Sequence, residues 1–326
     1  MTDSGASPPV QARGGGTPPR RTLERVVFVA IALLLAGAAI VATATQDPSV
    51  APAVSALQGT LKKIHDTGTI TLGYRESSLP FSYLNKLGQP IGYSLDLCGE
   101  IADAAAAELG MELKTALVPV TAADRFDKVK SGAIDLECGS STSNLQRKRE
   151  VAFSPILFVA GTKLLVPETS HVRSYRDLAG KTVVVTAGTT NEAALRALSD
   201  KQNLGINFVT QRDHAASLAL LVAGKADAFA TDDVLLYGFI ATEPAARHMK
   251  VVGEYLSYDP YGLVFRRDDP AFGVLVEKTF ERLAAERRLA DLYAKWFLRR
   301  LRTGETLNLP MSPQLEEMFR VLGQPD

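Results

Sequence analysis

The chain contains two β-α-β-α-β runs, and this repeated alternation constrains its fold more than any other feature. The first run spans residues 70–138 and the second spans residues 183–231. Each opens on an apolar strand, TITLGY at 69–74 and TVVVT at 182–186, and continues into segments with helical spacing such as 95–109. Such alternation is typical of mainly parallel sheets covered by helices. We therefore predict an α/β protein with two lobes.

The segments around these runs predict how the lobes connect. Residues 256–266 have strand character, and a helical pattern opens at Asp268-Asp269-Pro270 and continues to about Trp296. The chain would cross between the lobes near 158–162 and again near 255–262, which gives a two-strand hinge. The predicted parts are a first lobe at 57–159 plus 260–300, a second lobe at 160–259, and a C-terminal extension at 301–326 that packs on the first lobe.

The N-terminal residues predict export from the cytoplasm. Residues 1–25 are rich in Gly, Pro and Ser and are predicted to be a disordered cytoplasmic tail. Residues 26–46 carry no charged side chain and are long enough, at roughly 20 residues, to cross a bilayer. Arginines precede this hydrophobic helix, so the rest of the chain would face outward. It is either a cleaved signal peptide, with Ala42-Thr43-Ala44 as the cut site, or an uncleaved membrane anchor, and residues 47–56 form a linker.

Composition excludes several classes of function. Lys plus Arg and Asp plus Glu both number 36, so the formal charge is zero and the basic footprint of a nucleic-acid binder is missing. The four histidines are scattered without metal-ligand spacing, and we predict neither a metal site nor a cofactor. Outside the cytoplasm, Cys98 and Cys138 could form a disulfide. The alternative is a pair of buried thiols, and the sequence leaves both open.

Polar residues gather where the predicted strands end and where the helices begin. Open parallel sheets bind ligands beyond the C-terminal ends of their strands. The residues at these places are Arg75, Arg125, Ser140, Thr142, Arg147, Thr190, His214 and Asp232. Each one taken singly is explained as a surface charge, a turn residue or a helix cap, but together they recur at one topological place.

The chemistry of this set fits a small molecule with two carboxylates and one amine. An arginine offers a planar, charged fork that binds a carboxylate through two hydrogen bonds. Hydroxyls and a helix N-terminus form a second anion site, and Asp232 is the natural partner of an ammonium group.

The order of several motifs resembles bacterial extracellular solute-binding proteins of family 3, the periplasmic amino-acid-binding proteins of ABC transporters. Within that family the likeness is to the glutamate/aspartate-binding subtype. The motifs run in unbroken order over about residues 57–320 and include YRESS-x-PF at 74–81, D-x-ECGS at 135–140, VVVT-x-GTT at 183–190, Asp213-His214, Asp232-Asp233 and KWF at 295–297. The resemblance implies a two-lobe periplasmic-binding-protein-like fold of type II.

The resemblance also implies a role for each candidate residue. Arg147, with Thr142 and Thr190, would hold the ligand α-carboxylate, and Asp232 with Ser140 would hold the α-amine. Arg75, Arg125 and His214 would hold the distal carboxylate. Where the acidic-ligand subtype has a serine before the second arginine, this chain has Ala122.

The function implied is the binding of glutamate or aspartate by hinge closure, as a monomer that delivers its ligand to an ABC permease and its ATPase. One alternative is a dehydratase on the same fold, with Glu76 or Glu137 as general acid. Another is a ligand sensor held in the membrane by residues 26–46. We predict a binding protein and not an enzyme.

Overall fold

The computed structural model describes residues 57–301, 304 and 306–325. The predicted tail at 1–25, the hydrophobic helix at 26–46 and the linker at 47–56 lie outside the described residues. Within the described part of the chain, no helix combines the length and apolar character needed to span a bilayer.

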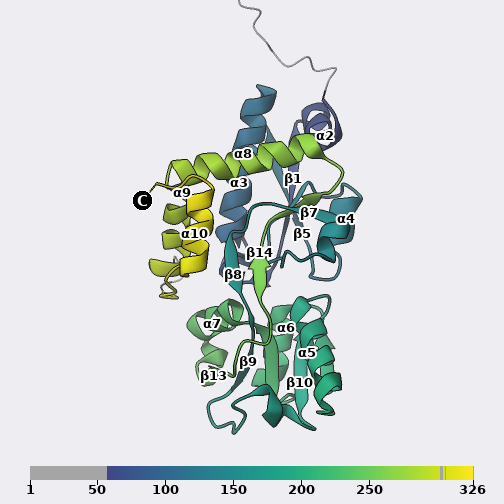
Figure 1. Cartoon of the computed structure of the whole chain (residues 1–326), viewed down its shortest axis with the longest axis vertical. Coiled ribbons are helices and arrows are strands. Elements are labelled where there is room, and N and C mark those ends of the chain that lie inside the picture. The colour runs from purple at the N-terminus through teal and green to yellow at the C-terminus, as the bar shows by residue number, and fades with distance from the viewer. Residues whose placement is uncertain (1–56, 302–303, 305, 326) are drawn as a thin grey trace, which may run out of the picture. The chain divides into compact units, whose positions relative to one another are not determined.

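Residues 57–326 form one compact unit built around two five-stranded sheets. The first sheet has the order β5-β1-β6-β15-β7 and lies in the upper lobe of Figure 1; the second has the order β11-β10-β12-β9-β13 and lies in the lower lobe. The strands of the first sheet are β1 (Thr69–Tyr74), β5 (Lys114–Pro119), β6 (Leu136–Glu137), β7 (Val151–Phe153) and β15 (Val264–Arg266). Those of the second are β9 (Thr162–Pro167), β10 (Thr182–Thr186), β11 (Asn207–Gln211), β12 (Ala228–Asp232) and β13 (Met249–Val252).

Both sheets are mixed, although parallel pairing dominates around the site. β1 pairs in parallel with β5 and β6, and β10 pairs in parallel with β11 and β12. In each sheet one strand, β15 or β9, runs against its neighbours. The two predicted β-α-β-α-β runs thus supply the parallel strands of each sheet. The antiparallel strands β9 and β15 each directly follow a crossing between the lobes, whereas β7 and β13 precede the crossings.

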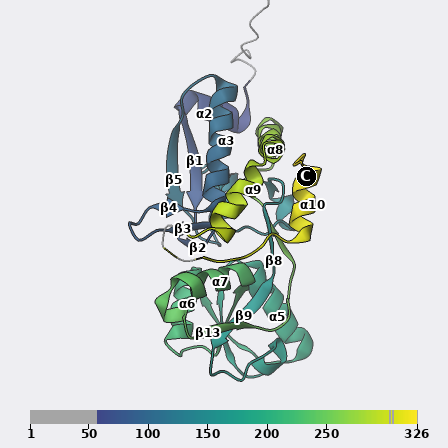
Figure 2. The ribbon, with the colours of Figure 1, turned by 90° about the vertical axis from the view of Figure 1, so that its left-hand side faces the viewer.

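Helices cover both faces of each sheet because alternate strand residues point to opposite sides. In the second lobe, Val183 and Val185 pack on the face that holds Leu195, whereas Val184 packs on the opposite face with Leu218. The helices of this lobe are α5 (Thr190–Gln202), α6 (His214–Val222) and α7 (Asp233–Thr242). Those of the first lobe are α2 (Gly59–Thr67), α3 (Tyr93–Leu109), α4 (Arg125–Lys130), α8 (Pro270–Ala285), α9 (Arg288–Tyr293) and α10 (Pro313–Val321). Figure 2 shows α3 alongside β1, with which it is in contact.

Two short strands connect the lobes. β8 (Phe158–Ala160) and β14 (Asp259–Tyr261) pair antiparallel and run between the two sheets in Figure 1. An aromatic cluster fastens them to the first lobe: the Phe81 ring lies 5.0 Å from that of Tyr261, and the Phe158 ring lies 5.0 Å from that of Phe297. The two connecting strands are therefore packed into the hydrophobic core of the first lobe.

Several predicted elements are corrected by the structure. The strand expected at 133–138 is only Leu136–Glu137, because the Asp135 carboxylate accepts the backbone N–H of Thr71. The strand expected at 256–266 is divided into β14 and β15, and the long helix after Pro270 breaks at Arg287, whose φ is 59°. A small sheet of β2 (Ser77–Ser78), β3 (Ser82–Leu84) and β4 (Pro90–Ile91) has no counterpart in the sequence predictions.

The two cysteines form a disulfide, which decides between the alternatives that the sequence left open. Cys98 of α3 is bonded to Cys138, with Cα atoms 6.2 Å apart. The bond holds α3 against the end of β6, directly before Gly139 and Ser140, where the polar residues of the first lobe begin.

Candidate functional site

All eight predicted site residues line one small cavity between the lobes. Arg75, Arg125, Ser140, Thr142 and Arg147 come from the first lobe, and Thr190, His214 and Asp232 come from the second. Thr189 and Asn191 also line it and were missed by the sequence analysis. The prediction that these residues converge is correct, because the strands that carry them end at facing sheet edges. Their role in binding remains a prediction.

Local structure places the second-lobe residues at helix starts. The Thr189 hydroxyl caps α5 by accepting the backbone N–H of Glu192, so that Thr190 and Asn191 occupy its first turn. Asp213 caps α6 in the same way through Ala216, which puts His214 at the first position of that helix. The free amides of both helices therefore begin beside the cavity, where they favour an anion.

Three guanidinium groups face the cavity without a carboxylate partner. Arg75 and Arg125 are each 2% exposed, and among the described residues neither they nor Arg147 forms an ion pair. Nη2 of Arg75 and Nε of Arg125 are buried and have no hydrogen-bond partner in the part of the chain that is described. Buried donors are nearly always paired, so these two indicate an acceptor that enters from outside.

Arg147 bridges the lobes through backbone carbonyls. Its Nη1 donates to the Thr142 carbonyl at 3.0 Å, and its Nη2 donates to the Gly188 carbonyl at 3.2 Å. Its guanidinium carbon also lies 5.1 Å from the centroid of the Phe126 ring, on which Arg125 stacks as well. A ligand carboxylate at this guanidinium would meet both lobes at once.

Burial shapes the charges of the site. It lowers the pKa of all three arginines, and the neighbouring Arg125 charge lowers the pKa of Arg75 and Arg147 further. Because the ordinary arginine pKa lies above about 12, the three remain cations at neutral pH. Their mutual repulsion makes the pocket strongly attractive to an anion.

His214 is a neutral hydrogen-bonding group. The side chain is 2% exposed, and its Nδ1 lies 2.9 Å from Oγ1 of Thr186. Burial, followed by the charges of Arg75 and Arg125, lowers the pKa of His214 well below its usual value. The imidazole thus contributes no charge at pH 7 and can donate or accept a hydrogen bond.

Asp232 occupies the other end of the cavity beside a second buried acid. Its Oδ1 accepts from Nδ2 of Asn191 at 2.9 Å. Burial, and then the charge of Asp259, raise the pKa of Asp232 to about 7. Asp259 itself accepts from the Thr190 hydroxyl at 2.9 Å and from Ser257. Two buried carboxylates therefore lie close to one another in this part of the cavity wall.

Two buried acids near the site escaped the sequence analysis as site residues. Asp259 lies in a stretch read only as strand, and Glu137 was considered only as a general acid for the dehydratase alternative. Glu137 is completely buried behind the cavity lining, and its Oε2 accepts from the Ser141 hydroxyl at 2.7 Å. Both lie inside the strands predicted at 133–138 and 256–266 and so lacked the signal that identified the others, although in the structure Glu137 ends β6 and Asp259 begins β14.

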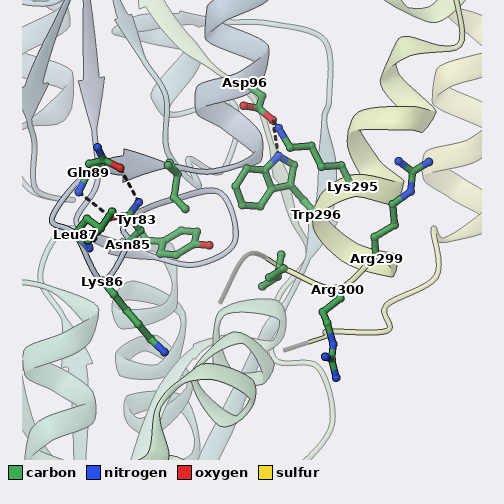
Figure 3. Close-up of a pocket in the computed structure, with 12 residues that line it drawn as sticks. Tyr83, Asn85, Lys86, Leu87, Gln89, Asp96, Lys295, Trp296, Arg299 and Arg300 are labelled. Atoms are coloured by element: carbon green, nitrogen blue, oxygen red, sulfur yellow. Dashed lines mark hydrogen bonds and ion pairs between the residues drawn. The ribbon is translucent and has the colours of Figure 1, made fainter. Parts of the chain in front are cut away.

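A larger, open groove lies elsewhere on the first lobe and holds none of the predicted residues (Figure 3). Asp96 neutralises part of it by accepting from Nζ of Lys295 at 2.5 Å and from Nε1 of Trp296 at 2.6 Å. Its rim is exposed, with Leu87 81% accessible. Because its charges lie in water and are partly paired, the buried arginines make the smaller cavity the candidate site.

Comparison with known proteins agrees with this architecture. Residues 70–299 match the family model of bacterial extracellular solute-binding proteins, family 3. The chain is 42% identical to an L-glutamate/L-aspartate-binding protein of Pseudomonas aeruginosa, over 89% of this chain and 96% of that protein. It is 34% identical to a glutamate/aspartate import solute-binding protein of Escherichia coli K12, over 86% and 93% respectively.

Solved structures confirm the two-lobe α/β fold. An ancestral arginine-binding protein bound to glutamine matches with a TM-score of 0.65 and 27% identity, over 71% of this chain and 99% of that one. The ancestral amino acid-binding protein AncCDT-1, a precursor of cyclohexadienyl dehydratase, matches with a TM-score of 0.64 and 26% identity, over 73% and 99%. These relatives are binding proteins, which confirms the prediction of a binding protein and not an enzyme. The family is extracellular, as the predicted export requires, and the chain belongs to it: it is a member of the bacterial extracellular solute-binding proteins, family 3.

Proposed function

We propose that this protein binds glutamate or aspartate in the cavity between its lobes and serves as the solute-binding component of an ABC uptake system. One observation carries the proposal: three arginines without carboxylate partners, of which Arg75 and Arg125 are buried, line the same cavity as the buried Asp232. An acidic amino acid supplies two carboxylates and one ammonium, which complement these groups. The names of the relatives in Pseudomonas aeruginosa and Escherichia coli support the same ligand class.

Each end of the ligand has a set of partners. The α-carboxylate is held by Arg147 with Thr142, Thr190 and the first turn of α5, and the ammonium is held by Asp232 with Ser140. The distal carboxylate is held by the two arginines with unsatisfied donors, Arg75 and Arg125, and by the neutral His214. A glutamine amide would leave these guanidinium donors partly unpaired, at a cost of about 1.5–3 kcal/mol for one lost hydrogen bond to a charged group.

Closure of the lobes around the ligand provides the signal for transport. Contacts across the gap support this step: the backbone N–H of Ala215 donates to Ser77 at 3.3 Å, and the hydroxyls of Thr142 and Thr190 lie 3.1 Å apart. The lobes comprise 57–159 plus 260–300 and 160–259, in a type II arrangement that turns about β8 and β14, and 301–326 packs on the first lobe. A ligand that touches both lobes favours the closed form by differential contact. Small-angle scattering should therefore show compaction when glutamate is added.

The transport partners are a membrane permease and its ATPase, and the protein acts as a monomer outside the cytoplasm. Residues 26–46 direct export after the cytoplasmic tail, as a cleaved signal peptide or a retained anchor. Membrane fractionation with N-terminal sequencing of the mature protein separates these two fates.

A thermal-shift screen of the twenty amino acids tests the ligand class. We expect glutamate and aspartate to raise the melting temperature strongly, and Arg147→Gln to abolish every response. Arg176→Gln is the matched control, because that arginine is exposed and pairs with Glu254 away from the cavity. Stabilisation by arginine or lysine, without a response to either acidic amino acid, would refute the proposal.

A further inference from the structure

We propose that Glu137 is the internal counter-ion of the empty site and that its charge limits how strongly the site prefers a dicarboxylic ligand. Glu137 is a positioning residue, because it lies behind the cavity lining and acts through the arginines. The inference rests on the proposed function and adds a residue that sets its specificity.

The first support is the half-satisfied state of the Glu137 carboxylate. The side chain is completely buried, and its Oε2 is held by Ser141. Its Oε1 has no hydrogen-bond partner in the described residues, and the same holds for Nη2 of Arg75 and Nε of Arg125. One unpaired acceptor and two unpaired donors of opposite charge thus lie buried around one site. An unmatched buried charge is costly, so these groups are expected to stabilise one another through their fields.

The second support is a glycine that makes room for the pair. A Cβ atom at Gly139 would lie 2.2 Å from Oε1 of Glu137 and 2.8 Å from Cγ of Arg75. The two side chains therefore flank the same point, which only a residue without a side chain leaves open. Gly139 thus leaves space in which the Glu137 carboxylate lies beside the aliphatic stem of Arg75, and Glu137 itself does not line the cavity.

The third support is the balance of buried charge. Three arginines face three buried acids. Asp259 lies with Thr190 and Asp232 with Asn191, and Asp259 is the strongest of the charges that raise the pKa of Arg147. Glu137 is the buried acid beside the other two arginines, where it is the strongest of the charges that raise the pKa of Arg75 and of Arg125. Without ligand, the Glu137 charge partly offsets the repulsion among the arginines. The distal carboxylate of the ligand has the same effect when it is bound.

Glu137 is therefore expected to raise the stability of the ligand-free protein and to lower the preference of the site for glutamate over glutamine. Glu137→Gln keeps the shape and the acceptor for Ser141 but removes the charge. The arginines then repel one another with less compensation, so the ligand-free protein melts at a lower temperature. A ligand carboxylate meets a more positive site, so the ratio of glutamate to glutamine affinity should rise by about tenfold, as expected for unit charges several ångströms apart in a protein interior.

Calorimetric titration with L-glutamate and L-glutamine, together with the melting temperature of the ligand-free protein, tests this on the purified protein. Glu137→Asp retains the charge and should restore most of the wild-type ratio and stability. Glu150→Gln removes an exposed carboxylate that pairs with Lys130 and should change neither. The double variant Arg75→Gln/Glu137→Gln restores the charge balance and should be more stable than Glu137→Gln alone.

The outcomes distinguish an effect of the Glu137 charge from an effect of its side-chain packing. Equal loss of affinity for both ligands in Glu137→Gln, or a selective loss for glutamate, overturns the proposal. If Glu137→Gln does not fold, rescue by the double variant supports the proposal, and a double variant that is equally unstable overturns it in favour of packing. A wild-type protein that binds neither acidic amino acid refutes the proposed function, which is a separate result.

Discussion

Replacement of Arg75 by glutamine tests whether the arginine pair selects the distal carboxylate. Arg75 is 2% exposed, it forms no ion pair within the described residues, and its Nη2 is unsatisfied. Glutamine keeps a polar donor at the site but removes the positive charge. The perturbation therefore acts on the ligand interaction and not on a salt bridge of the empty protein.

The expected magnitude follows from the hydrogen bonds that are lost. A hydrogen bond to a charged group contributes about 1.5–3 kcal/mol, so glutamate affinity should fall roughly 10- to 150-fold. Glutamine carries no distal charge, so its affinity should change by less than about threefold. The ligand-free protein should not lose stability, because burial already disfavours this charge and lowers the pKa of Arg75.

Isothermal titration calorimetry with glutamate, aspartate and glutamine measures the effect, with Arg176→Gln as the exposed-arginine control. If glutamate and glutamine affinities fall by the same factor, Arg75 does not read the distal carboxylate. In that case the assignment of the two ends of the cavity is wrong.

Three further predictions concern the other end of the ligand, the pH dependence and the closure. Arg147→Gln should abolish binding of every amino acid in calorimetry, since its guanidinium reaches both lobes; residual binding of one ligand would contradict this. Burial and the neighbouring Asp259 raise the pKa of Asp232 to about 7, and an ammonium requires the ionised form, so affinity should weaken by up to about tenfold per pH unit below pH 7 and level off above it. Asp232→Asn should remove that slope, and an unchanged slope would refute the role. Gly238→Ala should stabilise α7 by about 0.5–1 kcal/mol yet weaken ligand binding, because its methyl would lie 2.8 Å from Leu79 across the gap; tighter binding would contradict closure.

Local patterns determined most of the architecture and the choice of site residues. Strands at 69–74 and 182–186 were predicted with the bounds of β1 and β10, because a short apolar run bounded by turn residues favours a β-strand. The candidate residues followed from topology: parallel strands end at one edge of a sheet, so side chains that follow them must gather there. The structure brings Arg75, Arg125 and Asp232 together for that reason.

Only the tertiary structure decided which charges are buried together. Nothing in the local sequence around Glu137 and Asp259 distinguishes a buried acid from an exposed one, since burial depends on chain that is distant in sequence. The disulfide between Cys98 and Cys138 likewise required the fold to bring α3 next to the residue that follows β6. The raised pKa of Asp232 and the neutral state of His214 are products of the same enclosure. The sequence determines which ionisable groups meet at the site. Their protonation states and the energies of their interactions depend on desolvation and on the distances between them, and these exist only in the folded chain.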